Sequence, residues 1–195
     1  MEQGKRTMKK FAAVLALGLC ASTFAQAETA PNWKFVEGGW AQAEFLGVNM
    51  NGFNLGGSAE VNENVFLRGD FTQVSKSGVD LDWTSLGGGY IFSVNNTTDM
   101  YVGVSYERVG ADDGEDDMSD SGYGVQAGVK SMLTDNFELN GEVGYVSIDG
   151  ESETMFTIGG QFYVNKQFAI GASYKQMDLD GIDFSVTKLT ARYSF

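Results

Sequence analysis

Between residues 34 and 195 the chain alternates apolar and polar positions with a period of two, which predicts β-strands rather than helices. Segment 137–147 shows the pattern most clearly. Its odd positions are mostly apolar and include Phe137, Leu139, Val143 and Tyr145, whereas its even positions include Glu138, Asn140, Glu142 and Gly144. A strand of this sequence has one apolar face with an aromatic residue at each end, and one polar or small face.

The same pattern recurs along the chain and predicts ten strands: 34–46, 52–61, 64–75, 80–94, 98–109, 121–133, 136–148, 153–165, 167–178 and 183–195. The first segment is the weakest, and we assign Val36, Gly38 and Trp40 to its outward row. Eight strands is the alternative, if that segment and one neighbour do not pair. Short polar turns at 62–64, 95–97, 134–136 and 165–167 alternate with more variable connections at 47–51, 76–79, 110–120, 149–152 and 179–182.

Composition supports strands and excludes several functions. The 195 residues include 26 Gly, and 13% of the chain is aromatic, which suits strands joined by tight turns. The net charge of −13 disfavours binding to nucleic acid, because phosphate is neutralised by Lys and Arg. The sequence has no His, which removes the usual general base and the commonest metal ligand. We therefore expect no enzyme activity and no cofactor.

The first residues resemble an export signal. Lys9 and Lys10 precede a short apolar stretch, and Ala25-Gln26-Ala27 fits a cleavage site. We expect a signal peptide over 1–27, cleavage after Ala27, and a barrel domain over 28–195; Met8 is an alternative initiator. Cys20 raises a rival interpretation as a lipid-modified residue, but Leu19 stands where that signal needs a small residue.

Period-two alternation alone does not tell which face of a barrel is inside, so the position of the aromatic residues decides it. Aromatic residues gather at both ends of the apolar rows, as they do at the two interfaces of membrane barrels. One group lies near the variable connections: Trp40, Phe53, Phe71, Tyr106, Tyr123, Tyr145, Phe156 and Tyr174. The other lies near the short turns: Phe92, Phe137, Phe162, Phe168 and Phe195.

The opposite row carries charges of both signs, as expected of a narrow lumen where an unpaired charge is costly. The acids are Glu37, Glu60, Asp70, Glu107, Glu138 and Glu142, and the bases are Arg68, Lys130, Lys175, Lys188 and Arg192. The inward aromatics are Phe66, Trp83, Tyr101 and Tyr163. Together with the charged side chains they are expected to leave little room for solute in the lumen, because small barrels fill their interior with side chains.

The last strand ends on Tyr193 and Phe195 in the apolar row, a pattern typical of the terminal signal read by the barrel-assembly machinery. Together with the export signal and an even number of strands, it favours a closed antiparallel transmembrane β-barrel, since lipid cannot satisfy an open sheet edge. The alternative is a soluble secreted β-barrel that binds a ligand.

Three stretches carry a family resemblance: Phe35 to Trp40, Leu55 to Asn64 and Thr134 to Leu139. They resemble the small bacterial outer-membrane barrels called diffusible-signal-factor-regulated outer-membrane proteins. More loosely, the chain is similar to OmpA-type and OmpX-type barrels, without the periplasmic domain of the former. The resemblance implies architecture and provides no catalytic motif.

The 110–120 segment holds six acids and no base, which is typical of a solvated outer loop. Weak divalent-cation bridging to lipopolysaccharide is the alternative, although the spacing does not match a calcium loop. We therefore expect a monomeric outer-membrane barrel of a Gram-negative-type bacterium, with a structural or surface-interaction role and acidic loops outside. Its partners would be membrane lipid, lipopolysaccharide, the assembly machinery and periplasmic chaperones. A narrow channel for small solutes is the other function considered.

Overall fold

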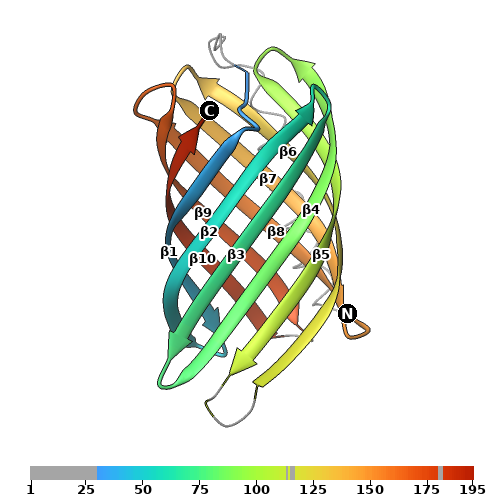
Figure 1. Ribbon diagram of the computed structural model, residues 1–195, viewed down its shortest axis with the longest axis vertical. Helices are drawn as coiled ribbons and strands as arrows, with labels where there is room; N and C mark the ends of the chain where they lie inside the picture. The colour runs from blue at the N-terminus through green and yellow to red at the C-terminus, as the bar shows by residue number, and fades with distance from the viewer. Residues whose placement is uncertain (1–29, 113, 115–116, 180–181) are drawn as a thin grey trace, which may run out of the picture.

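Ten antiparallel strands close into one barrel, in which each strand pairs with its neighbours in sequence and β1 pairs with β10 (Figure 1). The computed structural model describes residues 30–112, 114, 117–179 and 182–195. The strands are β1 (Phe35–Phe45), β2 (Val48–Asn62), β3 (Val65–Lys76), β4 (Val79–Asn95), β5 (Thr98–Asp112), β6 (Asp117–Thr134), β7 (Phe137–Ile148), β8 (Glu151–Tyr163), β9 (Phe168–Leu179) and β10 (Ile182–Ser194). The described residues contain no helix long and apolar enough to cross a membrane.

The predicted closed ten-stranded barrel is confirmed, and the eight-stranded alternative is wrong. The weak first segment forms β1, which pairs with β10 from Phe35↔Ser194 to Phe45↔Phe184 and with β2 from Phe35↔Ser58 to Phe45↔Val48. Its outward row is the predicted one, since the Val36 and Trp40 side chains are exposed. The predicted signal peptide and Ala27 lie outside the described residues.

The start of β1 and the end of β10 lie at the upper end of the barrel in Figure 1, which we call the terminal end. The four short turns also lie there. Three of them use the same side-chain contact, in which an Asn Oδ1 accepts a hydrogen bond from the backbone N–H two residues on. These contacts are Asn62 with Asn64 (3.0 Å), Asn95 with Thr97 (2.9 Å) and Asn165 with Gln167 (2.9 Å).

The opposite end, which we call the hairpin end, differs from the prediction. Segments 47–51 and 110–120 were expected to be loops, but β2 begins at Val48, β5 runs to Asp112 and β6 begins at Asp117. Three connections there turn on two residues with positive φ, for example Leu46 and Gly47 (φ 51° and 75°), a geometry that matches the twist of a hairpin. Strand pairing continues here because polar outward side chains suit a strand whose outer face meets water.

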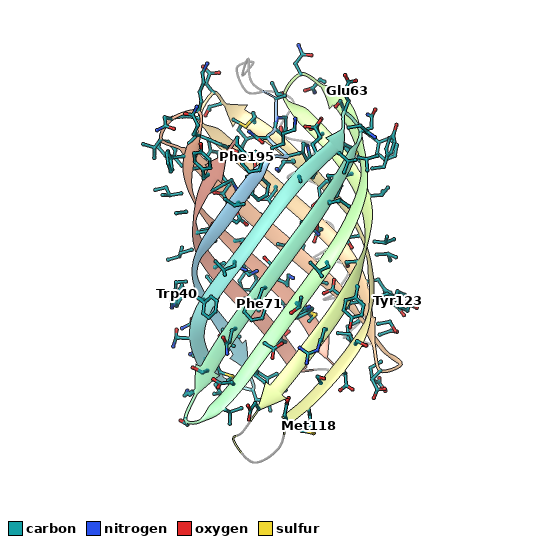
Figure 2. All side chains as sticks on the ribbon, in the orientation of Figure 1. Trp40, Glu63, Phe71, Met118, Tyr123 and Phe195 are labelled. Atoms are coloured by element: carbon teal, nitrogen blue, oxygen red, sulfur yellow. The ribbon has the colours of Figure 1, made fainter. Side chains whose placement is uncertain are left out.

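The outward row is apolar and exposed over the middle and the terminal end of the barrel. Leu55, Leu67, Leu86, Val102, Val104 and Ile170 are among its members, each with 47–64% of its surface exposed. Figure 2 shows Phe195 near the terminal end, and Trp40, Phe71 and Tyr123 at a second level nearer the hairpin end. The two predicted aromatic levels therefore exist, but the second does not coincide with the turns. From Tyr106 and Tyr123 the β5–β6 pair continues to Asp112↔Asp117.

Beyond that second level the pattern inverts. The outward row becomes polar, with pairs such as Gln42 and Asn51 (3.1 Å) and Arg108 and Asp82 (3.6 Å). The inward row becomes apolar and buries Ala41, Ala43, Met50, Val74, Val146, Met155, Met177 and Val186. The expectation of one polar inward row along the whole barrel is therefore wrong at the hairpin end. This part of the barrel has the inside and outside of a water-soluble barrel, and it extends past the apolar band.

Inward glycines let the strands bend toward one another. A β-carbon on Gly39 would collide with the backbone carbonyl of Leu189 on β10, whereas one on Gly141, which lies on the outward row of β7, would meet only Val129 Cγ1 at 4.0 Å. We therefore expect Gly39→Ala to lower the free energy of unfolding by about 1–3 kcal/mol, as overpacking does. Gly141→Ala is the matched control and should change it by less than about 0.5 kcal/mol. Equilibrium unfolding in lipid vesicles measures both, and equal effects would contradict this account of the strand bend.

Candidate functional site: the barrel lumen

Aromatic and apolar side chains fill the lumen at the terminal end. Trp33, which precedes β1, turns into the barrel and packs on Phe66 (ring centroids 4.6 Å) and Tyr101 (5.2 Å). Ile91 completes the cluster, and all four side chains are buried. The Trp33 Nε1–H donates to Asp99 Oδ2 at 2.8 Å, which fixes the orientation of the indole. We call Trp33, Phe66, Ile91 and Tyr101 the plug.

Beside the plug lies a network of two acids and two bases. The Arg192 guanidinium contacts Glu37 (Nη2 to Oε2, 2.7 Å) and Glu138 (Nη1 to Oε1, 3.1 Å). The Lys130 ammonium lies 3.7 Å from Glu138 Oε1 and donates to the Asn32 carbonyl at 2.6 Å. Glu138 is 0% exposed. Charges buried this deeply are stable only when paired, so the network holds β1, β6, β7 and β10 in register.

Two further ion pairs cross the middle of the lumen. Arg68 Nη1 donates to Glu142 Oε2 at 2.8 Å, and the Tyr101 hydroxyl donates to the same oxygen at 2.6 Å. Lys188 Nζ lies 2.7 Å from Asp70 Oδ1. These pairs link strands that are not neighbours in the sheet, since β3 contacts β7 through one pair and β10 through the other. The predicted balance of charges in the lumen is thus realised as specific pairs.

Most of the predicted inward residues lie where the sequence placed them, with one omission and one surprise. Asp99 was missed, although it precedes Tyr101 by two positions and so shares its face; it also accepts a hydrogen bond from Ser93 Oγ at 2.8 Å. Within the described ranges, Glu107 has no base within ion-pair distance. It accepts instead from Trp83 Nε1 (2.6 Å) and Ser85 Oγ (2.8 Å).

Lys175 is the lumen cation for which, within the described ranges, the structure gives no acid within ion-pair distance. Its ammonium lies 4.8 Å from the centre of the Trp83 ring, a cation–π contact. Lys34, Arg68, Lys130, Lys188 and Arg192 each have a carboxylate partner.

A cavity of about 150 Å³ lies between the ion pairs. Ser58 Oγ, Thr157 Oγ1 and Gln161 Oε1 line or border it and have no hydrogen-bond partner within the protein. A polar space of this size accommodates water, which satisfies such atoms. The middle of the lumen is therefore polar and has room for water, whereas the terminal end is filled.

The other candidate residues are on the surface. Tyr193 lies on the outward row of β10 and packs on Phe168 with ring centroids 5.1 Å apart. Phe195 is 64% exposed, and its backbone N–H donates to the Lys34 carbonyl at 3.1 Å. Among the residues that the structure describes, no group of acids is arranged to hold a metal ion. In the acidic 110–120 segment, residues 110–112 end β5 and residues 117–120 begin β6, and of the four residues between the strands only Gly114 is described.

Residues 11–159 match the family model described as outer membrane protein beta-barrel domain. The chain belongs to this family. The exposed apolar band of the barrel is therefore its lipid-facing surface, and the polar row lines the lumen, as the aromatic pattern predicted. No curated protein sequence matches the chain. The family fits an outer-membrane location, which the sequence predicted.

Solved structures of outer-membrane barrels are similar to this chain at low sequence identity. Ail, the attachment invasion locus protein of Yersinia pestis, is 21% identical with a TM-score of 0.43, covering 86% of this chain and 100% of Ail. The N-terminal barrel domain of Pseudomonas aeruginosa OprF is 13% identical with a TM-score of 0.44, covering 83% and 99%. The KdgM porin is 11% identical with a TM-score of 0.46, covering 83% and 99%.

Proposed function

We propose that this protein is a non-conducting outer-membrane anchor that presents its hairpin end at the cell surface. The observation that carries the proposal is the plug. Its four buried side chains, with the Lys130, Arg192, Glu37 and Glu138 network beside them, occupy the lumen at the terminal end. A solute on a path through the barrel would have to displace the Trp33 indole and break buried ion pairs.

The direction of the barrel in the membrane follows from general features of the family. Short turns face the periplasm in outer-membrane barrels, and longer hairpins face outside. The terminal end, with its short Asn turns, would therefore face the periplasm. The hairpin end would project from the membrane, which suits its polar outward row. Contact with lipopolysaccharide or with other surfaces would then take place through the projecting hairpins.

Conductance separates an anchor from a channel. We expect the refolded protein to give no steady single-channel current in planar bilayers, because the plug and the ion pairs leave no continuous path. Removing two plug side chains in Trp33→Ala/Tyr101→Ala should raise the frequency of current steps. Trp40→Ala removes a lipid-facing indole instead and is the matched control, which should stay silent. Steady current from the unaltered protein would contradict the proposal and support a channel for small solutes.

Several finer expectations belong to the same proposal. The absence of His supports a role without catalysis or cofactor. Cleavage after Ala27 would leave a barrel with no Cys, suited to an oxidising compartment. Tyr193 and Phe195 would be read by the assembly machinery, with periplasmic chaperones acting earlier, and the folded protein would be a monomer. Membership of the diffusible-signal-factor-regulated group rests on the three resembling stretches.

A further inference from the structure

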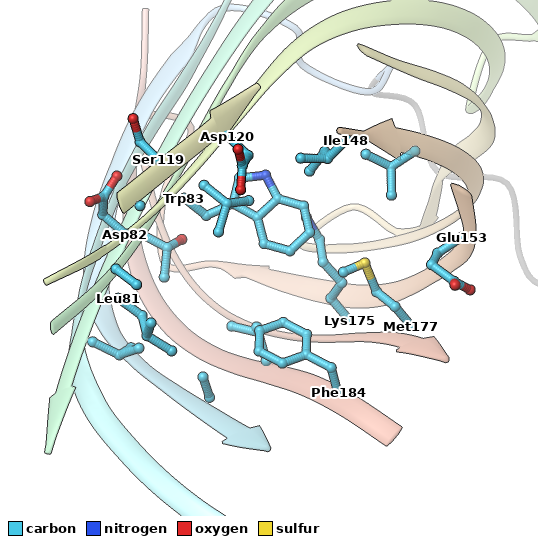
Figure 3. Close-up of a pocket in the computed structure, with 18 of the residues that line it drawn as sticks. Leu81, Asp82, Trp83, Ser119, Asp120, Ile148, Glu153, Lys175, Met177 and Phe184 are labelled. Atoms are coloured by element: carbon cyan, nitrogen blue, oxygen red, sulfur yellow. The ribbon is translucent and has the colours of Figure 1, made fainter. Parts of the chain in front are cut away.

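The hairpin end contains a second, larger cavity that the anchor role does not use (Figure 3). Its volume is about 390 Å³, within the range of about 300–1,000 Å³ typical of small-molecule sites. We call it the cup. Its walls come from the part of the barrel where the inward row is apolar: Ala43, Val74, Leu81, Val109, Val146, Ile148, Met177, Phe184 and Val186.

The base of the cup, which is its end toward the middle of the lumen, is formed by a Trp83 side chain held in a fixed orientation. The Trp83 ring projects into the cavity in Figure 3, and its Nε1–H is fixed by the 2.6 Å bond to Glu107. Phe184 packs against this ring with centroids 6.1 Å apart. An aromatic wall fixed by a buried hydrogen bond is preorganised, so a ligand would meet little ordering cost.

One cation at the base has no carboxylate within ion-pair distance in the described part of the chain. The cup shares three lining residues with the smaller lumen cavity: Lys175, Lys188 and Asp70. Lys188 pairs with Asp70 at 2.7 Å, whereas the Lys175 ammonium lies 4.8 Å from the centre of the Trp83 ring and interacts with Asp70, Glu142 and Glu107 only at longer range. Lys175 lies at the boundary between the apolar cup and the polar lumen cavity. An ammonium there is less hydrated than in bulk water and therefore favours an anion more strongly.

The rim of the cup is acidic, with Asp120, Glu151 and Glu153 among its residues. Asp82 borders the cup from the outward row and is paired with Arg108 at 3.6 Å. The rim charges lie at the water interface, where salt screens them. The repulsion that remains grows with the charge of an anion, so it opposes a multiply charged anion more than a singly charged one. The rim therefore restricts the anion to one with a low charge.

We propose that the cup binds a monoanionic amphiphile, with its carboxylate at Lys175 and its apolar chain against Trp83, Phe184 and Met177. The proposal goes beyond the anchor role and does not depend on it, since ligand binding and conductance are measured separately. The fit combines an apolar wall of suitable volume with a cation at its base that has no carboxylate within ion-pair distance in the described residues. An uncharged apolar ligand would leave the Lys175 ammonium with only the longer-range acids Asp70, Glu142 and Glu107.

Bromine quenching of tryptophan emission tests the proposal in the full chain refolded into lipid nanodiscs. The probe is 2-bromooctanoate, whose bromine would sit beside the carboxylate and therefore near the Trp83 ring. We expect a saturable part of the quenching that Trp83→Phe abolishes. Quenching of the lipid-facing Trp40 by probe dissolved in the nanodisc would persist in that variant and would not saturate. The neutral methyl ester of the same acid should bind more weakly.

Variants of the base residue decide the role of the charge. Lys175→Met should weaken binding of the acid about tenfold, as loss of a charge-assisted hydrogen bond does, with no effect on the ester. Lys175→Arg should retain binding, and Lys76→Met, which removes an exposed Lys at the same end of the barrel, should change nothing. Heat-modifiable mobility on gels confirms that each variant is folded.

Three results would overturn the proposal. The first is saturable quenching that persists in Trp83→Phe. The second is equal affinity of the acid for the unaltered protein and for folded Lys175→Met. The third is displacement of the probe by octylamine at lower concentration than by octanoate, which would make the acidic rim the charged contact and the ligand a cation.

Discussion

Glu138→Gln should destabilise the barrel by about 3–5 kcal/mol, the cost of breaking a buried ion pair by removing one partner. Glu138 is fully buried and faces both Lys130 and Arg192. Arg192 keeps Glu37 as a partner, but Lys130 has no other carboxylate within ion-pair distance in the described part of the chain. The amide fills the same volume, so the loss comes from the unpaired ammonium. Equilibrium unfolding by guanidinium chloride from lipid vesicles, followed by tryptophan emission, measures the change.

A double variant separates charge from packing. Adding Lys130→Met to Glu138→Gln removes the stranded cation and should restore most of the lost stability, because neutral replacements of buried ion pairs are often tolerated. Glu44→Gln changes an exposed acid on the outer face of β1 and should alter stability by less than about 0.5 kcal/mol. An effect of Glu138→Gln as small as that of Glu44→Gln would mean that the network contributes little to folding.

The sequence was sufficient for the number of strands, the closure and the direction of the side chains through the lipid-facing band. Val104 and Leu67 are exposed members of such period-two rows. A shift of one residue would turn the whole apolar row of a strand inward, so the pattern determines which side chains face out. For the lumen, the sequence predicted that acidic and basic side chains occur together on the inward row. The individual partners, such as Arg68 with Glu142, depend on strand tilt and register, which are properties of the closed barrel.

Two features of the lumen could not be obtained from alternation. Trp33 precedes the first strand, so the alternation of inward and outward positions does not tell which way its side chain points. Its place in the plug follows from the hydrogen bond to Asp99 and from the rings around it. The inversion at the hairpin end was missed because alternation looks the same whichever face is buried. Met177 and Phe184 were available as signals, since each falls on the row opposite to the lipid-facing residues of its own strand.

Val104→Arg should destabilise the barrel by about 2–4 kcal/mol, the cost of an Arg on the lipid face near the bilayer midplane. Val104 is 64% exposed on β5 and pairs with Gly88 and Val125, well inside the apolar band. Ser75→Arg is the matched control, because Ser75 is also exposed and outward but lies beyond the second aromatic level, where it pairs with Asn51 and Asp80. It should change the free energy of unfolding by less than about 0.5 kcal/mol in the same vesicles. The opposite ranking of the two variants would place hydrocarbon around the hairpin end, and the cup would then lie inside the membrane instead of projecting from it.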